Sequence, residues 1–216
     1  MALQATHIKF ALDLQAKYNV KNLEKYISGA NYPDSRFLTG VGREKTHDLD
    51  SLELLDSDFK KGWHNHLICD LVQGAAFDLV LPEEFNAQKA SLVAGNDLWI
   101  RRTVIKVLQE IEIFRTFDIQ PYLKSLDYVN NPNGENIELV RKNNQIIQNI
   151  YKGKQSITIA DALNMWRGLS LSEELIDKIQ TEAERIIIDQ KIIGQVGNLY
   201  PRMLDLSAKY YQDLEI

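Results

Sequence analysis

The chain has 216 residues, of which 44% are hydrophobic and 25% are charged, as in an ordinary folded globular protein. Its 25 basic and 30 acidic residues give a net charge of −5, and the absence of a dense basic run argues against a nucleic-acid partner. The single cysteine, Cys69, excludes a disulfide within the chain and a cysteine-based zinc cluster, and we expect it to be a small buried side chain. No apolar run approaches the roughly 18 residues of a membrane span, and no signal peptide is evident, so we expect a cytoplasmic protein without stable membrane insertion.

Helical periodicity, together with only 11 glycines and 5 prolines, predicts an all-α fold, a multi-helix bundle without strands. We expect a single helical domain over 1–216, the alternative division being a core over 1–130 with a helical C-terminal extension over 134–216. Turn residues predict loops over 28–35, where Pro33 would stop a helix, and over 39–48. The predicted helices cover 6–17, 23–27, 56–79, 96–117, 121–129, 135–152, 159–167, 171–193 and 200–214.

The predicted helix 56–79 carries an unusual polar pair on an apolar face. Trp63, His66, Asp70, Gln73 and Phe77 recur at steps of three or four residues and therefore share one side of the helix. Buried polar groups must be satisfied, and a bound metal ion is one way to satisfy them. His64 falls on the opposite side, where we expect it to be exposed to solvent.

Histidines are confined to the start of the chain, because all four (His7, His47, His64 and His66) lie within the first 66 residues. His66 and Asp70 stand at positions i and i+4 of a helix, so both side chains can reach one ion, although a surface hydrogen bond explains the same spacing. Imidazole nitrogen and carboxylate oxygen suit zinc, or manganese or iron as the share of oxygen ligands grows. Asp34 follows a proline in a tight turn and adds a second acid.

The order of these residues resembles the zinc-dependent phospholipase C-like family. The resemblance runs over about residues 7–80 and consists of His7, Gly-x-x-x-Pro-Asp ending at Asp34, Arg-x-x-x-His ending at His47, and Gly-x-x-x-His-x-x-x-Asp ending at His66 and Asp70. It implies an all-α fold that holds metal ions between helices. It also implies that Asp34, His47, His66 and Asp70 enclose one ion, and that Asp70 bridges to a second ion bound by His7.

Two features of that family have no counterpart in this sequence. The family's further His, His and Glu group is missing, since no histidine follows position 66, and so is the N-terminal tryptophan that processing creates. We therefore expect a site for one or two ions, with Glu110 or Glu112 as candidates for a missing ligand.

The expected function is hydrolysis of a phosphoester bond by a metal-activated water. Asp34 would be a ligand or the base that takes the water's proton, and Arg43 would face the charge that develops on the phosphate. An ion pair of Arg43 with Glu44 or Asp48 is the competing interpretation. The substrate would be a small phosphoester or a phospholipid, and the lack of a basic amphipathic helix favours a soluble ester.

Two alternatives remain open at the level of sequence. An HD-domain phosphohydrolase would use His7, the adjacent pair His47 and Asp48, and a later acid, Asp97 or Asp118. A helical interaction protein with a structural or degenerate metal site would instead pair its later helices with a partner or with another copy of the chain. Its interface anchors would be Trp99, Trp166, Tyr210 and Tyr211, residues that equally suit a core.

Overall fold

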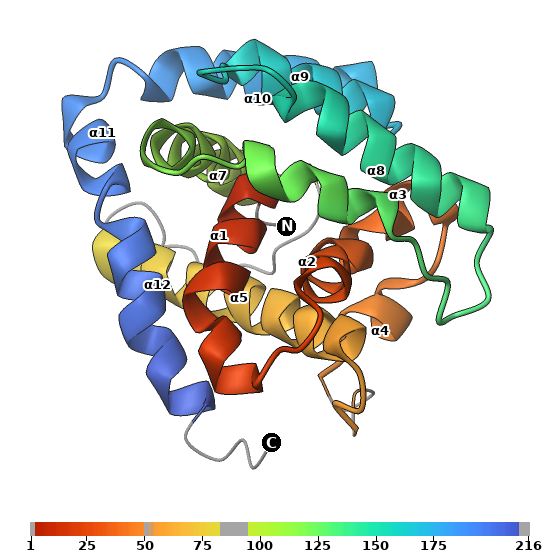
Figure 1. The fold of residues 1–216 in the computed structure, drawn as a ribbon. Coiled ribbons are helices and arrows are strands. Elements are labelled where there is room, and N and C mark those ends of the chain that lie inside the picture. Colours follow the sequence, from red (N-terminus) through yellow and green to blue (C-terminus); the bar gives the residue numbers. More distant parts are fainter. Residues whose placement is uncertain (1–2, 50–51, 53, 83–94, 212–216) are drawn as a thin grey trace.

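The computed structural model describes residues 3–49, 52, 54–82 and 95–211. Within these ranges the chain forms α- and 3₁₀-helices and no strand, which confirms the all-α prediction (Figure 1). None of the helices in the described ranges has the length and apolar character needed to cross a lipid bilayer.

Eleven α-helices and four 3₁₀-helices make up the described part of the chain. The α-helices are α1 (Gln4–Leu14), α2 (Leu23–Asn31), α3 (Arg36–Thr39), α4 (Arg43–Thr46), α5 (Asp58–Val80), α7 (Asp97–Thr116), α8 (Ile137–Tyr151), α9 (Ile159–Gly168), α10 (Glu173–Ile186), α11 (Gln190–Val196) and α12 (Leu199–Ser207). The 3₁₀-helices are η1 (Gln15–Tyr18), η2 (Tyr32–Ser35), η3 (Gln120–Asp127) and η4 (Ala208–Tyr210).

Several predicted boundaries were wrong. The loop predicted over 28–35 is the end of α2 followed by η2, because Pro33 occupies the first turn of η2, where its missing N–H leaves no hydrogen bond unmade. The loop predicted over 39–48 contains α4, and the helix predicted over 121–129 is the 3₁₀-helix η3. Residues 212–214 of the last predicted helix lie outside the described residues.

The long helix predicted over 171–193 is two helices. α10 ends at Ile186, and α11 begins after Asp189, whose carboxylate accepts hydrogen bonds from the backbone N–H groups of Lys191 and Ile192. A side chain that caps a new helix in this way competes with continuation of the previous one.

Six of the longer helices begin with a side chain that caps them, but α1, which carries His7, does not. Polar side chains accept a backbone N–H at the start of the longer helices; these caps are Asn22, Ser57, Asn96, Asn136, Thr158 and Ser172. At α1 the N-cap residue is Leu3, which offers no side-chain acceptor. The first turn of α1 therefore needs a partner from elsewhere in the fold.

The core forms where α5 passes beneath α1 and α2 (Figure 1). Helix α1 packs on α2, α5 and α7, and α12 packs on α5. Helices α8 to α10 form an outer layer over η3 and α7. The main cluster of buried apolar side chains includes residues from Leu3 to Tyr211, so both ends of the described chain pack on it. Cys69 is fully buried in this cluster, as expected.

Two glycines allow α2 and α5 to cross at close range. A Cβ on Gly29 would lie 2.0 Å from the carbonyl oxygen of Phe59, and a Cβ on Gly62 would lie 1.9 Å from that of Tyr26. Either distance is far inside van der Waals contact, so only glycine fits at both positions. The close crossing brings the end of α2 against the face of α5 that carries His66.

Candidate metal centre

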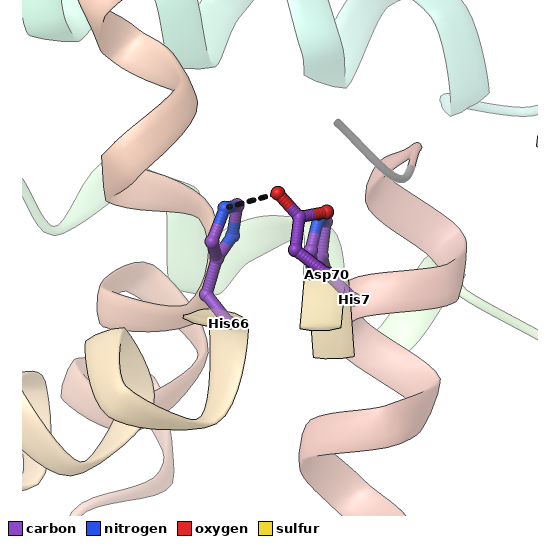
Figure 2. A group of neighbouring side chains, drawn as sticks. All are labelled: His7, His66 and Asp70. Carbon is purple, nitrogen blue, oxygen red and sulfur yellow. Dashed lines mark ion pairs between the residues drawn. The ribbon is translucent and has the colours of Figure 1, made fainter. Parts of the chain in front are cut away.

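The structure brings all five predicted ligand residues together. His7 comes from α1, Asp34 from η2, His47 from the residue after α4, and His66 and Asp70 from successive turns of α5. Asp70 lies at the centre: Figure 2 shows its carboxylate beside the imidazoles of His7 and His66. The prediction that His66 and Asp70 share a helical face, one turn apart, is confirmed.

The distances within the cluster exceed those of hydrogen bonds. The Nε2 atom of His7 is 3.8 Å from Oδ1 of Asp70, and the Nε2 atoms of His47 and His66 are 3.7 and 3.9 Å from Oδ2. His47 Nε2 is also 3.8 Å from Oδ1 of Asp34. Two ligand atoms bound tetrahedrally to one zinc ion, each at roughly 2.0–2.1 Å, stand about 3.4 Å apart. The observed spacing is thus close to that of ligand atoms arranged around an ion.

The cluster is buried, and most of its polar atoms lack a hydrogen-bond partner. The His7 and His66 side chains are fully buried, those of Asp34 and His47 are 2% exposed, and that of Asp70 is 13% exposed. Within the described ranges, both ring nitrogens of His7, both carboxylate oxygens of Asp34 and the Nε2 atoms of His47 and His66 accept or donate no hydrogen bond. Buried polar atoms are nearly always satisfied, so this convergence fits a site that completes its bonding with a cation.

Hydrogen bonds outside the cluster fix the orientation of His66. Its Nδ1 lies 2.8 Å from the carbonyl oxygen of Ala30, which can only accept, so Nδ1 carries the proton. The lone pair is then on Nε2, the nitrogen that faces Asp70. A histidine that donates one ring N–H to the backbone and offers the other nitrogen is the usual arrangement of a metal ligand. The glycine-mediated crossing of α2 and α5 places Ala30 for this contact.

A tryptophan anchors the segment that carries His47. The Trp63 Nε1–H donates to the carbonyl oxygen of Thr46 at 2.7 Å, which ties the end of α4 to α5. The Thr46 hydroxyl also lies 2.9 Å from Nδ1 of His47, leaving Nε2 to face Asp34 and Asp70. These two contacts therefore fix the position of the His47 imidazole, which follows a short helix.

Glu110 supplies the cap that α1 lacks. Its Oε1 accepts from the backbone N–H of Ala5 at 2.6 Å, and its Oε2 accepts from the N–H and hydroxyl of Thr6 at 2.9 and 2.6 Å. The Tyr151 hydroxyl donates to Oε1 at 2.6 Å. A carboxylate at this helix N-terminus satisfies orphan N–H groups and complements the helix dipole. The next residue along α1 is His7.

This arrangement corrects the expectation that Glu110 or Glu112 could be a metal ligand. The Glu110 carboxylate is fully engaged at the start of α1, and Glu112 lies 3.0 Å from Arg115 on the solvent side of α7. Neither belongs to the His/Asp groups of the described chain that could hold an ion. Glu110 instead binds the backbone N–H groups of the two residues that precede His7.

Burial shifts the pKa values of two of the imidazoles, those of His7 and His47, and of the Asp34 carboxyl. It lowers the pKa of His7 well below its ordinary value and that of His47 to about 2, so both imidazoles are neutral at pH 7 and offer lone pairs. Burial raises the pKa of Asp34. Burial would also raise the pKa of Asp70, but surrounding positive charges, including that of Lys106, hold it well below its usual range. Asp70 is therefore the permanent carboxylate of the cluster.

The imidazoles of His7 and His66 favour two ions over one. Their rings are stacked, with centroids 3.8 Å apart and planes inclined by 11°. A ring nitrogen binds a metal in the plane of its ring, and two nearly parallel planes at this separation do not meet at a shared ion. The residues that could hold an ion form two groups that overlap at His66, His7/His66/Asp70 and Asp34/His47/His66. The stacking leaves His66 to the second group and His7 with Asp70 to the first. Two-metal sites usually separate their ions by about 3.5–4 Å, comparable to the separation of the two rings.

Arg36 is an arginine influenced by the charges of Asp34 and Asp70, and the sequence had pointed to Arg43 instead. Arg43 is exposed at the start of α4, and within the described ranges it forms no ion pair with Glu44 or Asp48. Arg36 begins α3, two residues after Asp34, and is half-buried. Burial lowers its pKa, while the charges of Asp34 and Asp70 raise it. The Asp-x-Arg spacing was the only signal in the sequence.

The residues that the HD-domain alternative requires do not join the cluster. Asp48, Asp97 and Asp118 are all exposed, and none belongs to a possible ion-binding group of the described chain. Asp118 instead accepts the backbone N–H of Gln120 at the start of η3.

The expected solvent exposure of His64 was wrong. His64 is partly buried, with Nδ1 2.6 Å from the Tyr18 hydroxyl, because η1 covers that side of α5; burial lowers its pKa to about 4. The aromatic residues considered as interface anchors are mostly internal: Trp166 and Tyr211 are buried, and Trp99 and Tyr210 are partly buried.

No model of a known protein family, no curated protein and no solved structure matches the chain.

Proposed function

We propose that this chain is a metal-dependent phosphoester hydrolase that binds two ions, most simply zinc, between α1, η2, α4 and α5. The resemblance to the zinc-dependent phospholipase C-like family suggests this activity. The observation that carries it is the convergence of five buried His and Asp side chains, most of whose facing atoms have no hydrogen-bond partner within the described ranges. Imidazole nitrogens with carboxylate oxygens form a donor set that fits zinc and also manganese or iron.

The position and protonation of each side chain in the cluster determine the role that we assign to it. A bound divalent ion would supply Lewis acidity, which lowers the pKa of water from about 15.7 to about 7. His7, His47 and His66 hold their imidazoles toward Asp70, whose Oδ1 faces His7 and whose Oδ2 faces His47 and His66. Asp34 takes up a proton more readily than an exposed aspartate, because burial raises its pKa. It is suited to act as the base when it is not a ligand.

We place the substrate among small phosphoesters of the cytoplasm rather than bilayer lipids. The most exposed member of the cluster is Asp70, at 13%, so a substrate would meet the cluster at Asp70. A small ester needs no broad apolar surface around that residue.

A substrate screen with two variants tests the proposal. Phosphomonoesters, phosphodiesters and phospholipids are assayed with added Zn²⁺ or Mn²⁺, using wild type, His66→Ala and His64→Gln. We expect turnover by wild type and by His64→Gln, whose changed side chain lies on the same helix outside the cluster, and loss of at least about 100-fold in His66→Ala. A filled metal site without turnover of any ester would contradict hydrolysis and favour a structural site in an interaction protein.

A further inference from the structure

The two groups of ligands offer unequal numbers of side chains to an ion. The Nε2 atoms of His47 and His66 face the same oxygen of Asp70, Oδ2, at 3.7 and 3.9 Å. Asp34 adds its Oδ1, which is 3.8 Å from Nε2 of His47. Two imidazole nitrogens and two carboxylate oxygens therefore converge on one place, which we call the four-ligand position. Four protein ligands are the number with which structural zinc sites complete a tetrahedron.

The remaining place, which we call the His7 position, has fewer ligands. Nε2 of His7 faces the other oxygen of Asp70, Oδ1, at 3.8 Å (Figure 2). His66 adds no third ligand, because its ring is stacked on that of His7 and its Nδ1 is bonded to the Ala30 carbonyl. Its Nε2 belongs to the four-ligand position. Among the residues that the structure describes, the His7 position thus has two protein ligands.

Burial gives the four-ligand position the greater need of an ion. Both carboxylate oxygens of Asp34 and the Nε2 atoms of His47 and His66 are buried and form no hydrogen bond within the described ranges. An ion at this position satisfies these atoms together, so its binding is coupled to the stability of the fold. We expect the first ion to bind there.

A second ion binds against the charge of the first. Two-metal sites hold their ions about 3.5–4 Å apart, and two divalent cations at that separation repel each other strongly where water is scarce. The Asp70 carboxylate, which both positions share, offsets only part of this repulsion. Because it also has fewer ligands, the His7 position binds its ion more weakly.

We propose that the two ions load in a fixed order and that the second regulates the activity. The ion at the four-ligand position is held tightly and stabilises the fold, whereas the ion at the His7 position exchanges with the solution and is required for hydrolysis. The inference rests on the proposed function. An ion with few protein ligands keeps coordination positions open to substrate, as catalytic zinc sites do. The concentration of free divalent metal then switches turnover on and off while the chain stays folded.

Dialysis of the zinc-loaded chain against buffers of decreasing free Zn²⁺ tests this order, with zinc content, Tm and phosphoester turnover measured at each step. We expect the two ions to leave in separate steps, with dissociation constants that differ by at least about 100-fold. The first step should abolish turnover and keep most of the zinc-dependent rise in Tm. The second step should remove that rise, because the ion that leaves is the one coupled to folding.

Matched variants assign the steps to the two positions, since phenylalanine keeps a ring but offers no ligand atom. His7→Phe should leave one tightly held zinc, the zinc-dependent rise in Tm and no turnover. His47→Phe should weaken the tightly held ion by about tenfold or more. His64→Phe, on α5 but outside the cluster, is the control and should hold both ions as wild type does.

The outcomes separate this inference from the proposed function. Release of both ions in one step, or full turnover by wild type that retains a single zinc, would overturn the loading order and leave the proposed hydrolase intact. Wild-type chain that takes up no zinc, or that holds two ions and turns over no ester, would overturn the proposed function and the inference with it. The stepwise release is measured on wild type, so misfolding of a variant does not remove the test.

Discussion

Single side chains outside the cluster determine how its ligands are presented. His66 is oriented by the Ala30 carbonyl, and His47 by Thr46 and Trp63. Partners of this kind are reported to change metal affinity by about 10- to 100-fold when they are removed. The cluster should therefore be sensitive to substitutions that leave all five ligands unchanged.

Replacing Trp63 by Phe removes the N–H that donates to Thr46 and leaves that carbonyl without its partner. We expect zinc affinity to fall by about 10- to 100-fold, because the segment carrying His47 loosens. Competition with a zinc-binding dye measures the change. The matched control is Trp166→Phe, since the Trp166 N–H has no hydrogen-bond partner in the described ranges. Equal affinities of Trp63→Phe and wild type would show that this anchor is dispensable.

At the scale of the element, the start of α1 depends on a residue more than 100 positions away. Replacing Glu110 by Gln removes the charge and one acceptor facing Ala5, Thr6 and Tyr151. We expect a loss of about 1–3 kcal/mol in the free energy of unfolding and zinc content reduced toward one ion, because the turn that carries His7 loosens. Denaturant titration and elemental analysis measure the two effects.

The control for that change is Glu112→Gln on the same helix, where the carboxylate only pairs with exposed Arg115. Glu112→Gln should leave the free energy of unfolding and the zinc content near their wild-type values. If Glu110→Gln keeps two ions at full affinity, the cap does not position His7.

The crossing of α2 and α5 gives a second prediction at this scale. Gly62→Ala places a Cβ 1.9 Å from the Tyr26 carbonyl oxygen and forces the helices apart, so we expect a destabilisation of about 1–3 kcal/mol or more and weaker zinc binding. Gly74→Ala on the same helix meets open space and should stabilise by up to about 1 kcal/mol. Thermal unfolding of the two variants measures both changes in stability. Similar effects of the two substitutions would contradict a steric role for Gly62.

These elements show which features a sequence pattern can reveal. The i, i+4 spacing of His66 and Asp70 was predictable because both residues lie on one helix, and the family-like order added Asp34, His47 and His7. The cap by Glu110 was not predictable, since it depends on how α7 packs on α1. The break between α10 and α11 was missed because Asp189, a helix cap, stands inside an otherwise continuous apolar pattern.

At the scale of the whole molecule, metal binding should be linked to stability. The ligands come from α5 itself and from α1, η2 and the residue after α4, so an ion bound only by the folded state stabilises the whole arrangement. At free zinc about 1,000 times its dissociation constant, the gain is about 4 kcal/mol. For a chain of this size, that corresponds to an increase in Tm of about 10 °C.

Thermal unfolding with excess chelator and then with zinc restored measures this linkage. Asp70→Ala is the reference, because it removes the carboxylate that faces His7, His47 and His66 and should abolish the zinc-dependent shift. A wild-type Tm that is the same with chelator and with zinc would show that the fold gains nothing from the ion.

The most direct test of the central claim is anomalous diffraction from crystals of the zinc-loaded chain, with data collected on both sides of the zinc absorption edge. We expect two zinc peaks beside the Asp70 carboxylate, about 3.5–4 Å apart, one facing His7 and the other facing His47 and Asp34. Folded protein that shows no anomalous peak among these five side chains at saturating zinc would contradict it.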